Sequence, residues 1–233
     1  MSTNTGRAIT EGAEVVIGVR RLGSSKLSAS QPDYTAFCQL LKSSKAQEYF
    51  LILSTDTVQR VADQCWQQGE QIPQVLYGAQ TPHSWLTDPA FQGSVATDVT
   101  APFFDTAVPE VAAYRAAMKT YIPSLLGSAD DSSGGSFGWA MGQLLAYAVK
   151  HGGGITAGDI INGLYTAKDQ TLGGLIVPLT FTRGKNARID CGFLWTIENQ
   201  GYALTQQKAK PACAPTSLVA SYDGQIAKSL GAS

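Results

Sequence analysis

The chain has 233 residues, of which 44% are hydrophobic and 15% charged, and its formal net charge is -1. This length allows one large domain or two small ones with a buried core, and the charge gives no electrostatic reason to expect nucleic acid or an anionic membrane as a partner. No apolar run reaches the roughly 18 residues of a membrane-spanning helix, and residues 1–7 lack the apolar core of a secretory signal, so an exported form would carry its signal on sequence outside this chain.

Three apolar stretches in the first third of the chain have the length and composition of buried strands. They are residues 14–19, 49–53 and 73–77, which are rich in β-branched, aromatic and aliphatic side chains. A helical pattern lies between the first and second stretches, and another between the second and third. This order predicts a parallel sheet covered by helices on both faces.

Each of the two helical patterns has one apolar face. Asp33 is a suitable N-cap for the first helix and residues 54–56 for the second, which Gly69 ends. The apolar positions follow the spacing of one helix face: Tyr34, Phe37, Cys38 and Leu41 in the first helix, and Val58, Val61, Ala62 and Cys65 in the second.

The middle of the chain predicts a long loop followed by three helices. Residues 78–108 are interrupted by prolines and glycines and are interpreted as loop. Pro109 suits the first turn of a helix that ends before Pro123. A second helix is predicted over residues 137–151, and a third is predicted to begin at a capping box of Thr156 and Asp159.

The last part of the chain is predicted to be rich in strands. Residues 175–182 and 191–197 have the pattern of strands, and a turn at 199–201 leads into a further strand at 202–205. The tail after Gln207 is small and polar, and is expected to be loosely ordered apart from any tether through Cys213.

Four cysteines permit three disulfide pairings, and their spacing does not resemble that of a zinc site. The most local pairing joins Cys38 to Cys65 and Cys191 to Cys213. Right-handed crossovers place the first two helices on the same side of the sheet, so Cys38 and Cys65 could meet. Four buried thiols are the alternative, and disulfides would imply an oxidising compartment.

The strand assignments select the candidate binding residues, because ligands of open α/β sheets bind beyond the carboxyl ends of the strands. Arg20 follows the first strand, and residues 78–81 follow the third. The predicted ligand-binding residues are Ser54, Thr55, Asp56, Gln80 and Thr81. The first turn of the second helix also offers free N–H groups, which would suit a carboxylate. Alternatively, Ser54 and Asp56 only cap that helix.

Motifs for catalysis lack their required context, and no metal or cofactor site is predicted. Residues 134–138 match G-x-S-x-G, but they follow a polar loop where a nucleophile elbow needs a strand. Glycines 152–154 follow a helix and are interpreted as its terminator rather than as a phosphate loop. Asp130 and Asp131 are interpreted as part of a solvated loop. The sequence therefore predicts a protein that is not an enzyme.

The order of these elements resembles the carboxy-terminal part of the type I periplasmic solute-binding proteins of ABC importers, specifically the branched-chain amino-acid type. The resemblance covers roughly residues 12–206. It rests on a succession of motifs: Asp33-Tyr34-Thr35, YFLIL at 49–53, Gly69, Tyr77-Gly78, Val108-Pro109-Glu110 with Tyr114, the helical segments 137–149 and 156–164, and the segments 174–181 and 192–197.

The resemblance implies an α/β fold, with a parallel sheet flanked by helices in which one lobe is largely complete and the other partial. Residues 12–105 would be the βαβαβ unit of the second lobe, 106–172 a helical segment of the partial first lobe, 173–206 the β-rich completion of the second lobe, and 207–233 a tail. The chain would then be a fragment or a truncated gene product.

The resemblance also implies a function without catalysis or cofactor: capture of a small amino acid or a related polar or carboxylate solute by lobe closure, and delivery to an ABC permease. The expected location is periplasmic or extracellular, free or lipid-anchored. Gln80 stands where the family often has an acid that pairs with the ligand's ammonium group, and Ser54 where it often has an aromatic, so both argue against a branched-chain amino acid. A sensory or regulatory ligand-binding domain on the same fold is the alternative.

Overall fold

The computed structural model describes residues 22–23, 25–128, 130–185, 187, 189–205, 209–217 and 219–220. The predicted strand at 14–19 and Arg20 lie outside these residues, as does most of the predicted tail.

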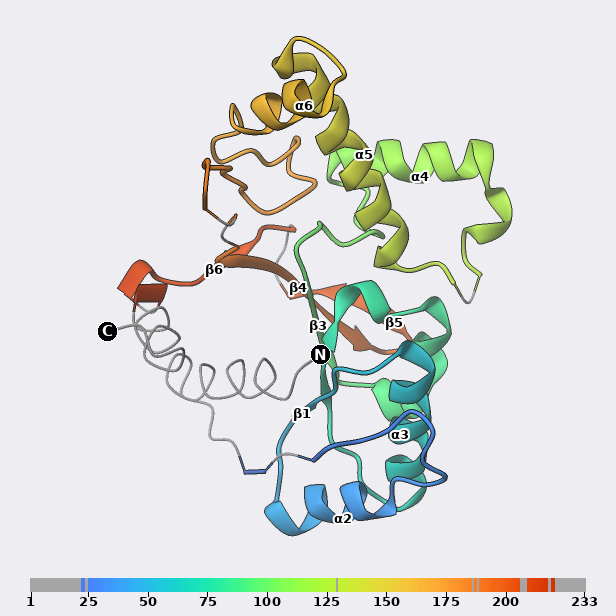
Figure 1. Cartoon of the computed structure of the whole chain (residues 1–233). Helices are drawn as coiled ribbons and strands as arrows, with labels where there is room; N and C mark the ends of the chain where they lie inside the picture. Colours follow the sequence, from blue (N-terminus) through green and yellow to red (C-terminus); the bar gives the residue numbers. More distant parts are fainter. Residues whose placement is uncertain are drawn as a thin grey trace.

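The described residues form one six-stranded mixed sheet, which runs through the centre of the molecule (Figure 1). The first three strands are parallel neighbours: β1 (Tyr49–Phe50), β2 (Gln74–Tyr77) and β3 (Val95–Asp98). The last three pair antiparallel, β4 with β3 and both β5 and β6 with β4: β4 (Cys191–Glu198), β5 (Gly201–Leu204) and β6 (Ala212–Cys213). The predicted α/β class is confirmed, but the sheet is mixed rather than wholly parallel.

Two helices pack together beside the parallel strands, as their apolar faces predict. They are α2 (Thr35–Ser44) and α3 (Thr55–Gln67), and the disulfide between Cys38 and Cys65 joins them inside a small apolar cluster. The prediction that Asp33 is the N-cap of α2 is wrong. That position is Tyr34, and the Asp33 carboxylate instead accepts a hydrogen bond of 3.1 Å from the Thr35 N–H.

Two strand predictions are wrong for identifiable reasons. β3 lies inside the segment interpreted as loop, where three short 3₁₀ helices, η1 (Gly78–Gln80), η2 (His83–Thr87) and η3 (Pro89–Phe91), precede it. β3 has only four residues and ends on polar Thr97 and Asp98, so it lacks an apolar run. Residues 175–182 form no strand: Leu175 lies in a turn, and the segment makes only isolated bridges, Thr100 with Ile176 and Gln170 with Leu179.

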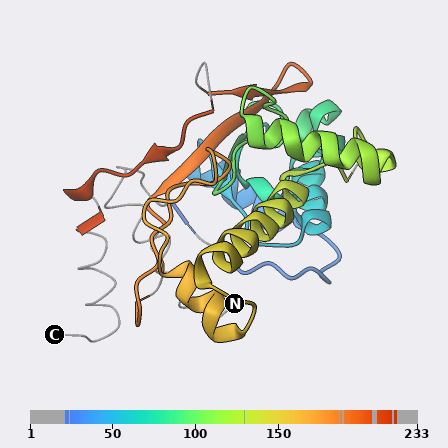
Figure 2. The ribbon, with the colours of Figure 1, turned by 90° about the horizontal axis from the view of Figure 1, so that it is seen from above.

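Three further helices lie beyond the ends of the central strands, at the top in Figure 1 and nearest the viewer in Figure 2. They are α4 (Pro109–Tyr121), which the short η4 (Pro123–Leu125) follows, α5 (Ser133–Gly152) and α6 (Ala157–Leu164). The Pro109 start and the capping box of Thr156 and Asp159 are confirmed.

Helix α5 begins at Ser133, four residues earlier than the sequence indicates. The glycines in its first turn suggest a loop, but they are there because the helix packs closely against α4. A Cβ on Gly135 would collide with the Tyr114 hydroxyl of α4. Gly163 of α6 likewise lies directly against the Ala148 carbonyl of α5, which lets the two helix backbones touch. Glycine therefore lowers the helix propensity of these segments but allows them to approach closely.

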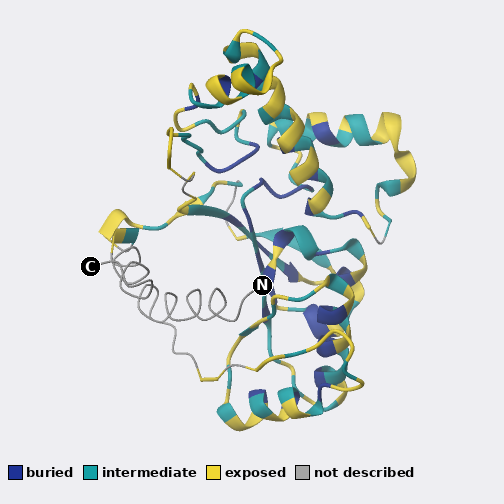
Figure 3. Cartoon of the chain, viewed as in Figure 1, coloured by how far each residue is buried: buried dark blue, intermediate teal, exposed yellow. Residues whose placement is uncertain are grey.

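One large apolar cluster connects the sheet with α3, α4 and α5. Its fully buried side chains include Trp85, Phe91, Val111, Leu175, Phe193 and Trp195. Burial is concentrated around α3 and the central strands, whereas α4, α5 and α6 are more exposed (Figure 3). The hairpin between β4 and β5 turns at Asn199 and Gln200, both with positive φ, which confirms the predicted turn.

The carboxyl-terminal end of the described chain is fastened to the sheet by the second disulfide. Cys191 of β4 and Cys213 of β6 are register partners, and their sulfur atoms are bonded. The predicted pairing of all four cysteines is therefore confirmed.

Candidate functional site

The three parallel strands end at one edge of the sheet, and the residues that follow them define the candidate binding crevice. Ser54 is the N-cap residue of α3 and is exposed, as is Asp56 in the first turn, while Thr55 is half-buried. The Ser54 hydroxyl lies 2.8 Å from the Thr57 hydroxyl and does not cap a backbone N–H. The first turn of α3 therefore presents the N–H groups of Thr55 and Asp56 at this edge together with three polar side chains, whereas the Thr57 N–H donates to the Ser54 carbonyl at 2.9 Å.

Gln80 ties the ends of two neighbouring strands together. Its side-chain amide donates a hydrogen bond of 2.9 Å to the carbonyl of Leu53, the residue before the N-cap of α3. Gln80 therefore lies next to Ser54 at the edge of the sheet, as the strand order predicts, and one of its two amide protons is already used inside the protein.

Thr81 is placed behind the crevice rather than in it. The residue is fully buried, its hydroxyl donates 2.6 Å to the Gly78 carbonyl, and its own carbonyl accepts from the Tyr202 hydroxyl at 3.1 Å. These contacts fix the turn at η1 against β5. Thr81 thus supports the turn that carries Gln80, and its side chain is not open to solvent.

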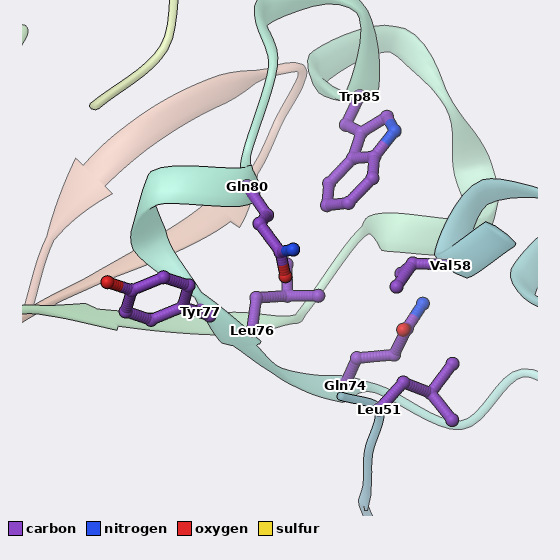
Figure 4. Close-up of a pocket in the computed structure, with 7 residues that line it drawn as sticks. All are labelled: Leu51, Val58, Gln74, Leu76, Tyr77, Gln80 and Trp85. Atoms are coloured by element: carbon purple, nitrogen blue, oxygen red, sulfur yellow. The ribbon is translucent and has the colours of Figure 1, made fainter. Parts of the chain in front are cut away.

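A narrow gap opens inward from this edge, between α3 and the sheet (Figure 4). Its walls are mostly apolar, with Tyr77 and Gln80 at the crevice end and Gln74 at the other end of β2. The remaining lining residues are Leu51, Val58, Leu76 and Trp85. The gap is too tight to admit a sphere the size of a water molecule.

Gln74 is the most unusual residue in this gap. Its side chain is 1% exposed, and neither its amide nitrogen nor its amide oxygen has a hydrogen-bond partner. Only its backbone is satisfied, because the Gln74 N–H donates to the Ser94 hydroxyl at 3.0 Å. Leaving a buried polar group unsatisfied costs about 1–3 kcal/mol. Sequence reasoning does not single out Gln74, because it is the first residue of a strand, where a polar side chain usually faces solvent.

Asp98 at the end of β3 was also missed, because its strand was not predicted. Its carboxylate is 3% exposed and accepts hydrogen bonds from the Val99 N–H at 2.6 Å and the Ser133 hydroxyl at 2.9 Å. Burial raises the pKa of Asp98, and these hydrogen bonds oppose part of the rise. Asp98 thereby connects the sheet edge to the first turn of α5.

Tyr77 and Gly78, at the end of β2, lie at the same edge of the sheet as Asp98. A side chain on Gly78 would overlap Trp195 and lie 2.8 Å from the Asp98 Cβ, so only glycine fits there. The Tyr77 ring is 44% exposed at the end of β2, and partial burial together with the Asp98 charge raises the pKa of its hydroxyl. Tyr77 is therefore expected to stay protonated at neutral pH and to be available as a hydrogen-bond donor.

The residues considered for catalysis have structural roles. Ser136 of the G-x-S-x-G segment lies in helix α5, is buried, and donates 2.9 Å to the Ser133 carbonyl. Asp131 is not part of a solvated loop as predicted: it is 2% exposed and binds Arg115 through both oxygens, at 2.7 and 2.9 Å. This ion pair anchors the segment before α5 to α4.

A second hollow, of about 260 Å³, lies on the outer side of α3 and is more open. It is lined by Pro32, Tyr34, Arg60, Asp63, Gln64 and Gln67. The Arg60 guanidinium donates 2.6 Å to the Ala29 carbonyl and lies over the Tyr34 ring. Burial raises the pKa of Asp63, as does the neighbouring Asp88 carboxylate. This hollow lies away from the strand ends, and its charged groups contact the protein itself.

Within the described ranges, no three His, Cys, Asp or Glu side chains are grouped so that they could hold a metal ion. Nor does any helix in that part of the chain combine the length and hydrophobicity of a membrane span.

Comparison with known families gives a match over most of the chain. The family described as periplasmic binding protein matches residues 3–202. A comparison with curated protein sequences finds no match.

Solved structures with a similar fold include proteins of ABC transporters. A substrate-binding protein from Aeropyrum pernix is 14% identical, with a TM-score of 0.71, and the match covers 92% of this chain and 57% of that protein. A leucine-binding protein from Thermotoga maritima is 12% identical, with a TM-score of 0.60 and coverages of 77% and 49%. A solute-binding protein from R. palustris, solved in complex with benzoate, is 15% identical, with a TM-score of 0.57 and coverages of 80% and 50%. The chain thus spans about half the length of these proteins.

Proposed function

Because the chain belongs to the periplasmic binding protein family, we propose that it forms part of a solute-binding protein that serves an ABC importer. Its role is to hold a small solute, without chemistry of its own, and to present that solute to a membrane permease. The expected location is periplasmic or extracellular, and the two disulfides agree with such an oxidising compartment.

The observation that carries this proposal is the grouping of polar atoms at the carboxyl ends of β1 and β2. The first turn of α3, the side chains of Ser54, Thr55 and Asp56, and the second amide proton of Gln80 all lie at that edge. Such an edge is where open α/β sheets bind small ligands. N–H groups at the start of a helix favour an anionic group, so a carboxylate is the ligand group that we expect there.

The helices α4–α6 would belong to a different lobe from the parallel strands, so that residues 12–105 and 173–206 form one lobe and 106–172 part of another. Asp98 and Ser133 then lie where the two parts meet. Closure of such lobes around a solute is a hinge motion in which a few residues at element ends absorb the change.

An NMR titration of the ¹⁵N-labelled chain tests the proposal, because chemical shifts detect even weak binding by a partial site. The probes are leucine and benzoate, the molecules named for two proteins of similar fold. For the solute that binds, we expect the largest shifts at the backbone amides of Ser54–Thr57 and Tyr77–Gln80, with millimolar affinity. Shifts confined to the outer hollow at Arg60, or conversion of either probe to a product, would contradict the proposal.

A matched pair of variants assigns the shifts to the crevice. Gln80→Ala removes the amide at the sheet edge and should weaken binding roughly two- to tenfold, the contribution of one net hydrogen bond. Gln67→Ala makes the same change on the exposed end of α3, away from the strand ends, and should leave binding unchanged.

A further inference from the structure

Gln74 lies in an apolar gap behind the crevice, and the crevice residues do not account for its buried, unbonded amide. The gap runs from Tyr77 and Gln80 at the sheet edge to Gln74 at the start of β2 (Figure 4). The two ends are three residue steps apart along β2, which corresponds to about 10 Å along the strand. Gln74 and Leu76 lie on the same side of β2, and the Gln74 amide projects toward Val58 among apolar walls.

The amide of Gln74 requires a partner that the closed gap does not contain. Both of its polar atoms are unbonded, and there is no room for water beside them. An aliphatic side chain at this position would satisfy the same packing without that penalty, since the surrounding residues are Leu51, Val58, Leu76 and Trp85. A polar group that enters the gap would satisfy the amide, which can both donate and accept.

Gln80 closes the gap at the crevice end through a single contact. Its side chain points toward Leu76 (Figure 4), and its amide donates one hydrogen bond, to the Leu53 carbonyl. Rotation of the Gln80 side chain breaks only one hydrogen bond and would open the gap toward the crevice. This opening would lead directly from the first turn of α3 to the Gln74 amide.

We propose that the gap opens into a pocket for the apolar body of the solute, and that the Gln74 amide binds a polar group at the far end of that solute. The ligand class is a small carboxylate with a flat or branched apolar body and a distal hydroxyl or carbonyl. Its carboxylate lies at the start of α3, its body contacts Val58, Leu76 and Trp85, and its distal group reaches Gln74. This inference rests on the proposed function, since it assumes that the crevice binds a solute.

The test compares two acids that differ only in a distal hydroxyl, benzoate and 4-hydroxybenzoate, by the same NMR titration. In the wild-type chain we expect 4-hydroxybenzoate to bind at least fivefold more tightly than benzoate, as one added hydrogen bond implies at roughly this magnitude. We also expect the side-chain NH₂ signals of Gln74 to shift only with 4-hydroxybenzoate.

Gln74→Met retains the length of the side chain and removes both hydrogen-bonding groups. The preference for 4-hydroxybenzoate should then disappear while benzoate binding is retained, and the melting temperature should rise by roughly 2–4 °C because the buried amide is gone. The control is Gln67→Met, the same change on the exposed end of α3, which should alter neither property. Equal preference in wild type and Gln74→Met, or a lower melting temperature for Gln74→Met, would overturn the inference.

Val58→Phe is a second test of the inference, and it leaves Gln74 itself unchanged. The larger ring fills the gap and should abolish binding of both acids, while circular dichroism shows whether the chain remains folded. Unchanged benzoate binding by folded Val58→Phe would also overturn the inference.

If neither acid perturbs the sheet edge of the wild-type chain but leucine does, the crevice binds a solute and only the pocket at Gln74 is rejected. If none of the three probes perturbs that edge, both this inference and the proposed function are rejected.

Discussion

Asp98 is a carboxylate that the fold buries at the end of β3, where it accepts hydrogen bonds from the backbone and from Ser133. Burial disfavours its ionised form and raises its pKa, so the folded chain retains this proton to a higher pH than the unfolded chain. The folded state is therefore favoured most below the unfolded pKa of about 3.9, and loses stability as pH rises through the raised folded pKa.

We predict that Asp98→Asn removes this dependence on pH. An asparagine side chain can still accept from the Val99 N–H, and it carries no charge to desolvate. The free energy of unfolding of the variant, minus that of the wild type, should therefore increase from pH 4 to pH 7, measured by urea denaturation at several pH values. A difference that stays flat or decreases over this range would show that hydrogen bonding outweighs burial at Asp98.

At the residue scale the sequence located Ser54, Thr55, Asp56 and Gln80 near the strand ends, because those positions follow directly from the strand order. It could not locate Asp98 or Gln74. Asp98 depends on recognising β3, and the burial of Gln74 depends on the Trp85 and Val58 side chains that cover it, which are distant in sequence. Contacts between separate elements are not encoded in local periodicity.

Helix α5 shows how elements depend on packing that local sequence does not reveal. Its glycines at 134 and 135 indicate a loop, yet they lie in the first helical turn. The reason is the close approach of Tyr114, whose hydroxyl occupies the space that a Gly135 side chain would need. By contrast, the longer apolar patterns of α2, α3 and α4 agree with the predicted helices, because each of these helices buries one continuous face.

Two glycines of α5 provide a matched test of that packing. Gly135→Ala should destabilise the chain by roughly 1–3 kcal/mol, because the new methyl group forces Tyr114 to move. Gly138→Ala should stabilise it by up to about 1 kcal/mol, because nothing lies within 4 Å of the added carbon and alanine favours the helix. Denaturant unfolding of both variants measures the two effects, and equal effects would show that Tyr114 does not restrict position 135.

On the scale of the whole molecule, two disulfides fasten the chain at distant places and in different surroundings. Cys38 and Cys65 are 0% and 2% exposed inside the cluster between α2 and α3. Cys213 is exposed on the short strand β6, and its partner Cys191 is half-buried in β4. A reductant in solution can therefore reach the second disulfide without unfolding the first.

We predict that dithiothreitol under native conditions reduces Cys191–Cys213 well before Cys38–Cys65. Alkylation followed by peptide mass spectrometry would measure the order. Loss of the buried link, which closes a separation of 27 residues, should lower the free energy of unfolding by roughly 3–4 kcal/mol. Simultaneous reduction of both links would mean that the helices α2 and α3 separate readily in the native chain.

The fluorescence of Trp85 can report on the gap beside α3, because this residue forms part of its wall. Its indole ring is 1% exposed, stacks on Phe91 with a centroid distance of 4.0 Å, and forms one wall of the gap. An opening of the gap would bring a polar solute or water to this ring, and the emission of an indole moves to longer wavelength when its surroundings become polar. The intrinsic fluorescence of the unlabelled chain can therefore follow the opening in real time, with Trp85→Phe as the variant that removes the signal.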